Sequence, residues 1–108
     1  MKVMKIQNPV LRGFHPDPSI VRVGKDYYIA TSTFEWWPGV KLSHSTDLVH
    51  WEDDGYILTD PGKLDLRGVG ISQGIWAPCL TWHKGIFYLA YTVVRAFYCN
   101  MYDTENYL

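Results

Sequence analysis

The segment PSIVRVGKDYYIATS, residues 18–32, has a counterpart 60 residues later in PCLTWHKGIFYLAYT, residues 78–92. In both, β-branched and aromatic residues flank a short Gly-Lys or Lys-Gly pair, a pattern that predicts a β-hairpin. The segments align without a gap, and the identical positions are Pro18/Pro78, Tyr28/Tyr88 and Ala30/Ala90. A chance likeness between two hairpins is one explanation. The other is a structural repeat with room for four strands per unit, which is typical of β-propeller blades.

The rest of the sequence also predicts an all-β fold. Short alternating or β-branched runs are separated by Gly, Pro and Asp turns, and helical periodicity is nearly absent. The expected strands are residues 19–23, 26–33, 40–45, a fourth near 55–58, then 79–83 and 86–94, with a helical turn in TDLVHW, residues 46–51. We expect one blade over about 14–60 and an incomplete second blade over about 72–108. Since a propeller needs about four blades to close, the sequence is expected to be the N-terminal part of a larger protein.

Composition narrows the classes of partner. The 108 residues are 47% hydrophobic with a formal net charge of −1, so neither disorder nor binding to nucleic acid or an anionic membrane is expected. Aromatic residues make up 16%, and such rings fill cores or stack on sugars and proteins. No signal peptide or membrane-spanning run is recognisable, which predicts a soluble cytoplasmic protein. The two cysteines, Cys79 and Cys99, are expected to be free buried thiols.

The two copies of the repeat differ at one acidic residue, Asp17. Pro18 recurs as Pro78, but Asp17 is aligned with Ala77, so the fold does not require an acid at this position. The residues that begin the innermost strand of a blade lie beside the propeller axis, where ligands commonly bind. Two interpretations remain open. Asp17 forms an Asx-turn or caps the start of the strand, or it takes part in a reaction.

A family resemblance favours the second interpretation. The stretches QNPVLRGFHPDPSIVRVGKDYYIATSTFEWWPGVKLSHSTDLVHW, residues 7–51, and GIWAPCLTWHKGIFYLAYT, residues 74–92, closely resemble the N-terminal part of β-xylosidases of glycoside hydrolase family 43. The resemblance implies a five-bladed propeller that removes terminal xylose from β-1,4-xylo-oligosaccharides with inversion. Many enzymes of this kind also cleave α-L-arabinofuranosyl groups, so the resemblance implies this activity as well. Asp17 matches the general base of the family.

Inverting hydrolysis needs a second carboxyl group. The base activates water while a carboxylic acid protonates the leaving oxygen, and the two groups stand roughly 6.5–9.5 Å apart. The resemblance places this acid and a further Asp that tunes it on later blades, so neither has a counterpart among these 108 residues. The other acidic residues considered are interpreted as solvated charges, and Glu35 is singled out because it lies in TFEWWPG. These residues are Glu35, Glu52, Asp53 and Asp54.

The resemblance also implies two aromatic residues of the sugar pocket. Phe34 matches a residue that packs against the innermost sugar, and Trp76 matches one that shapes the pocket wall. Core packing is the alternative for both, and it is weaker for Trp76 because the aligned residue in the first copy is Pro16. One position departs from the family pattern. The sequence reads WAPC where the family usually reads WAPD, so Cys79, a weak donor and poor acceptor, stands at an acidic position and counts against full activity.

No metal site is recognisable from the spacing of the histidines His15, His44, His50 and His83. His44 and His50 flank a predicted turn and are interpreted as polar residues with hydrogen-bond partners. No cofactor is expected. The resemblance leaves open a divalent cation in the central channel, for which no ligands can be assigned.

The sequence therefore leaves two alternative functions. The first is part of a glycosidase that takes xylo-oligosaccharide or arabinofuranosyl substrates, acts as a homo-oligomer when complete, and is inactive as 108 residues alone. The second is a non-catalytic carbohydrate-binding or interaction module built from the same blades, with no nucleic-acid or membrane partner.

Overall fold

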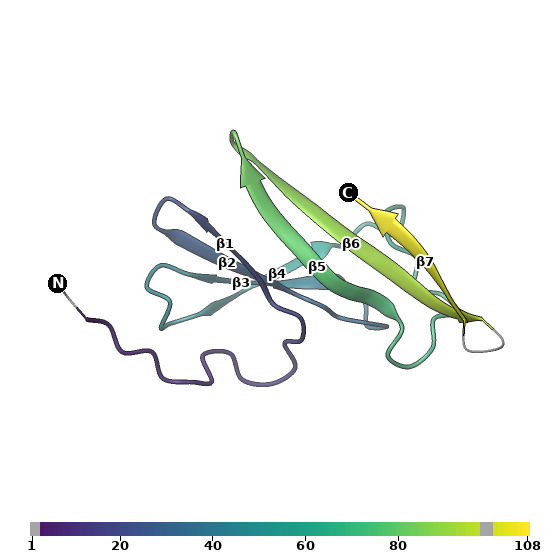
Figure 1. Ribbon diagram of the computed structural model, residues 1–108, viewed down its shortest axis with the longest axis horizontal. Helices are drawn as coiled ribbons and strands as arrows, with labels where there is room; N and C mark the ends of the chain where they lie inside the picture. The colour runs from purple at the N-terminus through teal and green to yellow at the C-terminus, as the bar shows by residue number, and fades with distance from the viewer. Residues whose placement is uncertain (1–2, 98–100) are drawn as a thin grey trace.

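Seven strands in two antiparallel sheets make up the fold (Figure 1). The computed structural model describes residues 3–97 and 101–108. The first sheet has the order β1-β2-β3-β4 and the second the order β5-β6-β7. The strands are β1 (Ser19–Val23), β2 (Asp26–Thr31), β3 (Gly39–Ser45), β4 (Glu52–Leu58), β5 (Gly74–His83), β6 (Ile86–Phe97) and β7 (Met101–Tyr107). No helix occurs in the described ranges, which confirms the all-β prediction.

The two predicted hairpins have the same strand register. In the first, Ser19 pairs with Ala30 and the ladder continues to Val23 opposite Asp26. In the second, Cys79 pairs with Ala90 and the ladder continues to His83 opposite Ile86. Every pairing of the first hairpin thus recurs at an offset of 60 residues. A two-residue loop closes each hairpin and fixes this register, so the two hairpins are structurally equivalent.

The second hairpin is longer than predicted. β5 begins at Gly74 instead of residue 79, because its first residues pair with β6 as far as Gly74 opposite Val94. The register shifts between Trp76 and Cys79, around Pro78. Proline lacks an N–H for the ladder and is tolerated within a strand at such a bulge. The proline that suggested the start of a strand in the sequence therefore lies inside one.

The predicted helical turn in residues 46–51 is wrong. Residues 46–50 form bends, and β4 then begins at Glu52. The Asp47 carboxylate accepts hydrogen bonds from the backbone N–H groups of Val49 at 2.8 Å and His50 at 2.7 Å. A short polar side chain that satisfies nearby backbone donors in this way competes with helical hydrogen bonding.

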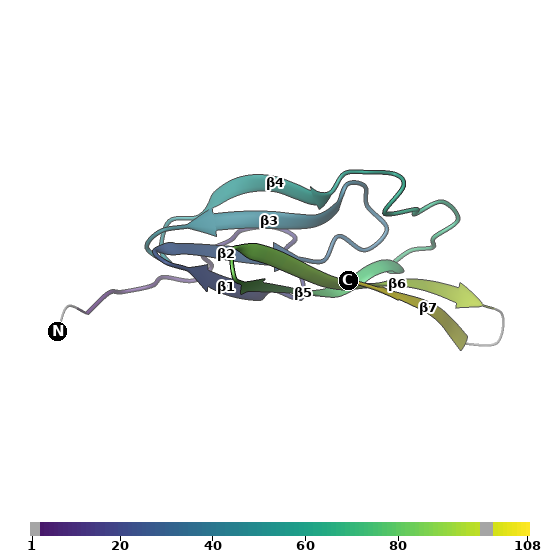
Figure 2. The same ribbon diagram turned by 90° about the horizontal axis from the view of Figure 1, so that it is seen from above.

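The two sheets meet through β1 and β5, which lie side by side in both views (Figures 1 and 2). The backbone N–H of Leu80 donates to Ser19 Oγ at 3.0 Å, and the rings of Tyr28 and Phe87 meet edge to face at 5.3 Å. The core spans both sheets and the loop between them, and consists of Ala30, Val40, Leu58, Leu64, Ile75, Leu80, Tyr91 and Val93. None of the described residues forms a helix long and apolar enough to cross a membrane.

Cys79 corrects one expectation about the thiols. It is free but exposed, not buried. After the bulge, β5 alternates with period two and Leu80 points into the core, so its neighbour Cys79 faces outward. Cys99 lies outside the described residues.

Candidate active site

Asp17 occupies an unusual backbone conformation just before β1. Its φ is 52°, in the left-handed region, and it lies between Pro16 and Pro18 with its side chain exposed. Asp is one of the few residues that tolerate this region. The proline rings on either side restrict the flanking φ angles, so the chain holds the carboxylate on a stiff backbone.

The Asx-turn alternative for Asp17 is not formed. Among the described residues, the Asp17 carboxylate accepts no hydrogen bond and forms no ion pair. Four other aspartates show what an Asx-turn looks like in this chain, since each accepts from the backbone N–H two residues ahead at 2.8–3.0 Å. They are Asp47, Asp53, Asp60 and Asp65. Unlike these four, Asp17 keeps both oxygens available for a ligand.

Phe34 lies where the loop after β2 meets the start of β5. It has a φ of 48°, and its carbonyl accepts from the Ile75 N–H at 3.0 Å in an isolated bridge between the sheets. Its half-buried ring packs against that of Phe14, with centroids 5.8 Å apart. A Cβ at Gly74 would overlap the Phe34 carbonyl, and Gly74 has a φ of 84°. Both features require glycine at the first residue of β5.

Trp76 is 39% exposed on β5, and its indole Nε1–H donates to the Ser72 carbonyl at 3.0 Å. The polar edge of the ring is thereby anchored to the loop before the strand. The same loop is held by Glu35, whose Oε2 accepts from the Ser72 N–H at 3.1 Å. The half-buried Glu35 is therefore a loop-fixing residue and not merely a solvated charge.

Backbone hydrogen bonds bring the three predicted site segments together. The segment before β1, the loop after β2 and the start of β5 are separated by up to some sixty residues in sequence, yet they are direct neighbours. The links are the hydrogen bonds Ser32 N–H to Pro16 O at 3.0 Å and Ile75 N–H to Phe34 O at 3.0 Å. Asp17, Phe34 and Trp76 each lie at or beside one of these links.

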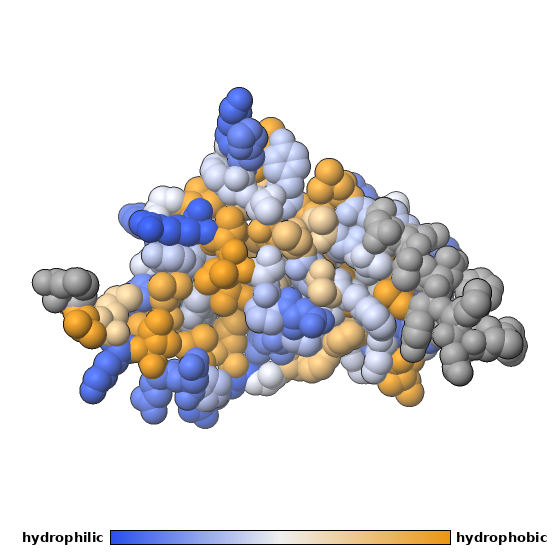
Figure 3. All heavy atoms as spheres, in the orientation of Figure 1, coloured by the Kyte–Doolittle hydropathy of each residue, from blue (hydrophilic) through white to orange (hydrophobic). Residues whose placement is uncertain are grey.

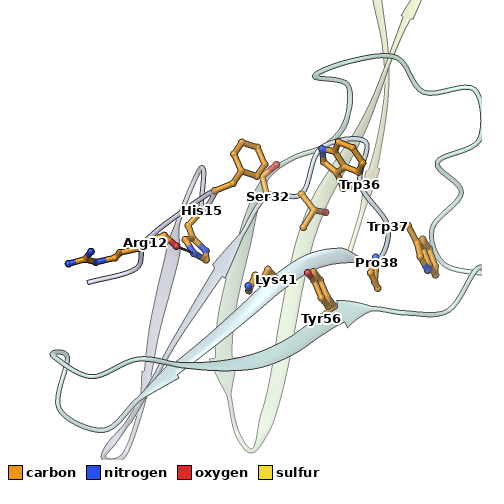
Figure 4. Close-up of a pocket in the computed structure, with 10 residues that line it drawn as sticks. Arg12, His15, Ser32, Trp36, Trp37, Pro38, Lys41 and Tyr56 are labelled. Atoms are coloured by element: carbon orange, nitrogen blue, oxygen red, sulfur yellow. Dashed lines mark hydrogen bonds between the residues drawn. The ribbon is translucent and has the colours of Figure 1, made fainter. Parts of the chain in front are cut away.

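A cavity of about 340 Å³ adjoins this region, but the three predicted residues do not line it (Figure 4). It lies between the N-terminal segment, the loop after β2, and strands β3 and β4. The side chains of His15, Lys41 and Tyr56 face the same space, whereas Arg12 extends away from it. The lining residues are Arg12, Phe14, His15, Ser32, Thr33, Trp36, Trp37, Pro38, Lys41 and Tyr56.

The charges around the cavity are partly neutralised. Lys41 Nζ lies 3.0 Å from Asp53 Oδ2. The pKa of Asp53 is lowered, first by the hydrogen bond from the backbone N–H of Gly55 and second by the hydrogen bond from Lys41. His15 Nε2 lies 2.8 Å from the Arg12 carbonyl oxygen, while its Nδ1 is buried and has no partner among the described residues.

His44 and His50 have the hydrogen-bond partners that the sequence analysis expects of them. His44 Nε2 lies 2.8 Å from Asp26, and His50 Nδ1 lies 2.7 Å from Asp47 Oδ2. The hydrogen bond from the His50 side chain, together with the backbone donors of the loop, holds the pKa of Asp47 well below its usual range. Within the described part of the chain, no three His, Cys, Asp or Glu side chains gather as metal ligands would.

Sequence reasoning missed three residues that shape this region: Phe14, Ser32 and Gly74. Phe14 precedes the HPDPS motif and Gly74 precedes Ile75 and Trp76, so both lie next to residues that had been singled out. Ser32 is aligned with Thr92 in the repeat. A hydroxyl present in both copies is typical of a structural position, so the sequence gives no sign of a function for Ser32.

Comparisons with known proteins identify the family of the chain. A family profile described as Glycosyl hydrolases family 43 matches residues 6–107. A beta-xylosidase of Bacillus subtilis is 53% identical over 97% of this chain and 20% of its own length. Xylosidase/arabinosidase 43B of Humicola insolens is 53% identical over 96% of this chain and 19% of its own length.

The structural likeness is equally close. The crystal structure of a xylan beta-1,4-xylosidase from Bacillus halodurans superposes with a TM-score of 0.91 at 59% identity, and covers 95% of this chain and 20% of that one. The chain spans about a fifth of the length of the relatives it matches. With the profile matched from residue 6 to residue 107, the chain belongs to glycosyl hydrolases family 43.

Proposed function

We propose that these residues form part of the catalytic propeller of a β-xylosidase, in which Asp17 is the general base of an inverting hydrolysis. The observation that carries the proposal is the state of Asp17. Its carboxylate is exposed on a left-handed residue between two prolines and is not used in an Asx-turn. A base must be ionised and aimed in a fixed direction, and this backbone serves that requirement.

In the proposed reaction, Asp17 takes a proton from a water molecule. The water oxygen attacks the anomeric carbon from the face opposite the leaving group, and the bond from that carbon to the glycosidic oxygen breaks. A carboxylic acid protonates the departing oxygen. That acid is expected on another blade, so the 108 residues supply one half of the acid–base pair.

Two aromatic residues are proposed to bind the terminal sugar. Phe34 is braced by Phe14, and Trp76 is anchored through its indole N–H. Packing of such a ring on the apolar face of a pyranose contributes on the order of 1–2 kcal/mol from area burial. Xylose is the proposed sugar because all three relatives described above are named as xylosidases. Removal of arabinofuranosyl groups is a second activity, which the Humicola insolens relative favours.

The proposal is tested in a complete propeller that contains these residues, assayed with aryl β-D-xylopyranoside, aryl α-L-arabinofuranoside and xylobiose. We expect turnover of the β-xyloside, and proton NMR of the first product formed should show α-xylose. Initial release of β-xylose would contradict inversion. Binding of xylobiose in a calorimeter without any turnover would instead establish the non-catalytic module.

A further inference from the structure

We propose that Ser32 is a positioning residue that couples the segments of Asp17, Phe34 and Trp76, and that its hydroxyl sets the place of Phe34 in the sugar pocket. The inference rests on the proposed function, because it concerns how that site holds its substrate. Neither the sequence motifs nor the family match assigns a role to this serine.

Ser32 is a three-way junction at the end of β2. The residue is 1% exposed. Its backbone N–H donates to the Pro16 carbonyl at 3.0 Å, and its Oγ donates to the Ile75 carbonyl at 2.5 Å. The Phe34 N–H in turn donates to the same Oγ at 3.3 Å. Each partner is one of the proposed site residues or the immediate neighbour of one.

The chemistry of the contact explains why a serine fits. A hydroxyl donates one hydrogen bond and accepts others, so a single buried atom can serve a carbonyl and an N–H at once. Alanine at Ser32 would leave the Phe34 N–H without this acceptor and the Ile75 carbonyl without this donor. A buried polar group that loses its partner carries the full cost of its desolvation.

The junction acts on Phe34 more than on Asp17. A φ of 48° is unfavourable for a bulky aromatic residue, so the surroundings must hold it there. The Phe34 backbone is held on one side by Ser32 Oγ and on the other by the Ile75 N–H. The link toward Asp17 uses the Ser32 backbone N–H, which alanine retains. Removal of the hydroxyl should therefore disturb sugar binding and leave the base in place.

The test compares Ser32→Ala with Thr31→Val in the complete propeller. Thr31 is the matched control, since it is the adjacent residue, is equally buried at 1%, and its Oγ1 has no partner among the described residues. For xylobiose we expect Ser32→Ala, which removes both hydrogen bonds of the hydroxyl, to raise KM about 5–10-fold, while kcat changes less than about 3-fold. Thr31→Val should leave both unchanged.

A second background separates positioning from a general loss of structure. In Phe34→Ala there is no ring to position, so adding Ser32→Ala should raise KM little further. Hydrogen exchange at the Phe34 amide should be faster in Ser32→Ala and unchanged in Thr31→Val. Additive KM effects, a loss confined to kcat, or unchanged exchange would overturn the role of Ser32 while the enzyme remains a xylosidase. A wild-type propeller that cleaves neither aryl glycoside refutes the proposed function itself, and with it this role.

Discussion

At the scale of single residues, aspartate side chains serve two different purposes in this chain, and their local hydrogen bonds distinguish the two. Asp47, Asp53, Asp60 and Asp65 each accept from a backbone N–H two residues ahead and thereby stabilise a turn. Asp17 stabilises no turn in the described structure, although it occupies a left-handed conformation that costs free energy. Strain without a local hydrogen bond is the pattern expected of a residue retained for its chemistry.

This contrast gives the first prediction. In the complete propeller, Asp17→Asn should lower kcat by about 10²–10⁴-fold, because an amide cannot take the proton from water. Asp60→Asn is the matched control, since the amide oxygen can still accept from Gly62 and its activity should be unchanged. The measurement is the steady-state rate with an aryl β-xyloside. An Asp17→Asn enzyme as active as Asp60→Asn would show that Asp17 is not the base.

Predictability from sequence differs between Asp17 and Ser32 for a physical reason. Asp17 could be singled out because the second copy of the hairpin has Ala77 in its place. Ser32 could not, because its function depends on a hydrogen bond to Ile75, 43 residues away. A contact of that kind leaves no local pattern in the chain. Only the folded structure shows that the carbonyl lies within reach of the hydroxyl.

At the scale of elements, local pattern predicted the hairpins well and the start of β5 poorly. The hairpins follow from alternation and turn residues, which are local properties. The first residues of β5 have no such alternation and become a strand because the long β6 pairs with them. Proline at position 78 would ordinarily indicate the start of a strand, and here it lies at a bulge that interrupts the ladder.

Gly74 provides a prediction for this element. Gly74→Ala should destabilise the propeller by about 2 kcal/mol or more, because the new methyl group would overlap the Phe34 carbonyl and the backbone has a positive φ. Gly24→Ala isolates the second cause, since Gly24 has a φ of 62° and open space around it. Chemical denaturation would measure both variants. Equal destabilisation of the two would show that the close approach of β5 to Phe34 contributes nothing.

The loop between β3 and β4 gives a pH-dependent prediction. The pKa of Asp47 is lowered in the folded state by the hydrogen bond from the His50 side chain and then by the backbone donors of His50 and Val49. A lowered pKa means that the ionised carboxylate stabilises the fold above its unfolded pKa of about 3.8, and that this contribution decreases as pH falls further. Asp47→Asn should therefore have a lower thermal midpoint than wild type at pH 6, and the difference should shrink at pH 2.5. A difference independent of pH would show that charge on Asp47 does not matter.

At the scale of the whole molecule, the chain exposes more surface than a closed domain of its size. Its accessible surface is 7760 Å², against about 6200 Å² expected for a compact monomer of 12.5 kDa. Its radius of gyration is 15.5 Å, against about 13 Å expected. Figure 3 shows hydrophobic side chains uncovered on the face where the two sheets meet and along the N-terminal segment. In a propeller, further blades would pack against such surfaces.

The excess surface predicts the behaviour of the 108 residues when they are produced alone. Exposed apolar residues include Ile20 on β1 and Ile86 and Phe87 on β6, and the outer strands have unpaired edges that can bind other chains. We expect self-association that increases with concentration, measured by analytical ultracentrifugation. We also expect no turnover of aryl xylosides, because the proposed mechanism requires a general acid that is expected on another blade. A monodisperse monomer would show that two sheets suffice as a folding unit. Turnover that is lost on Asp17→Ala would require a general acid within these 108 residues. The first carboxyl group to replace would then be that of Glu35, because Glu35 and Trp76 both hydrogen-bond to Ser72.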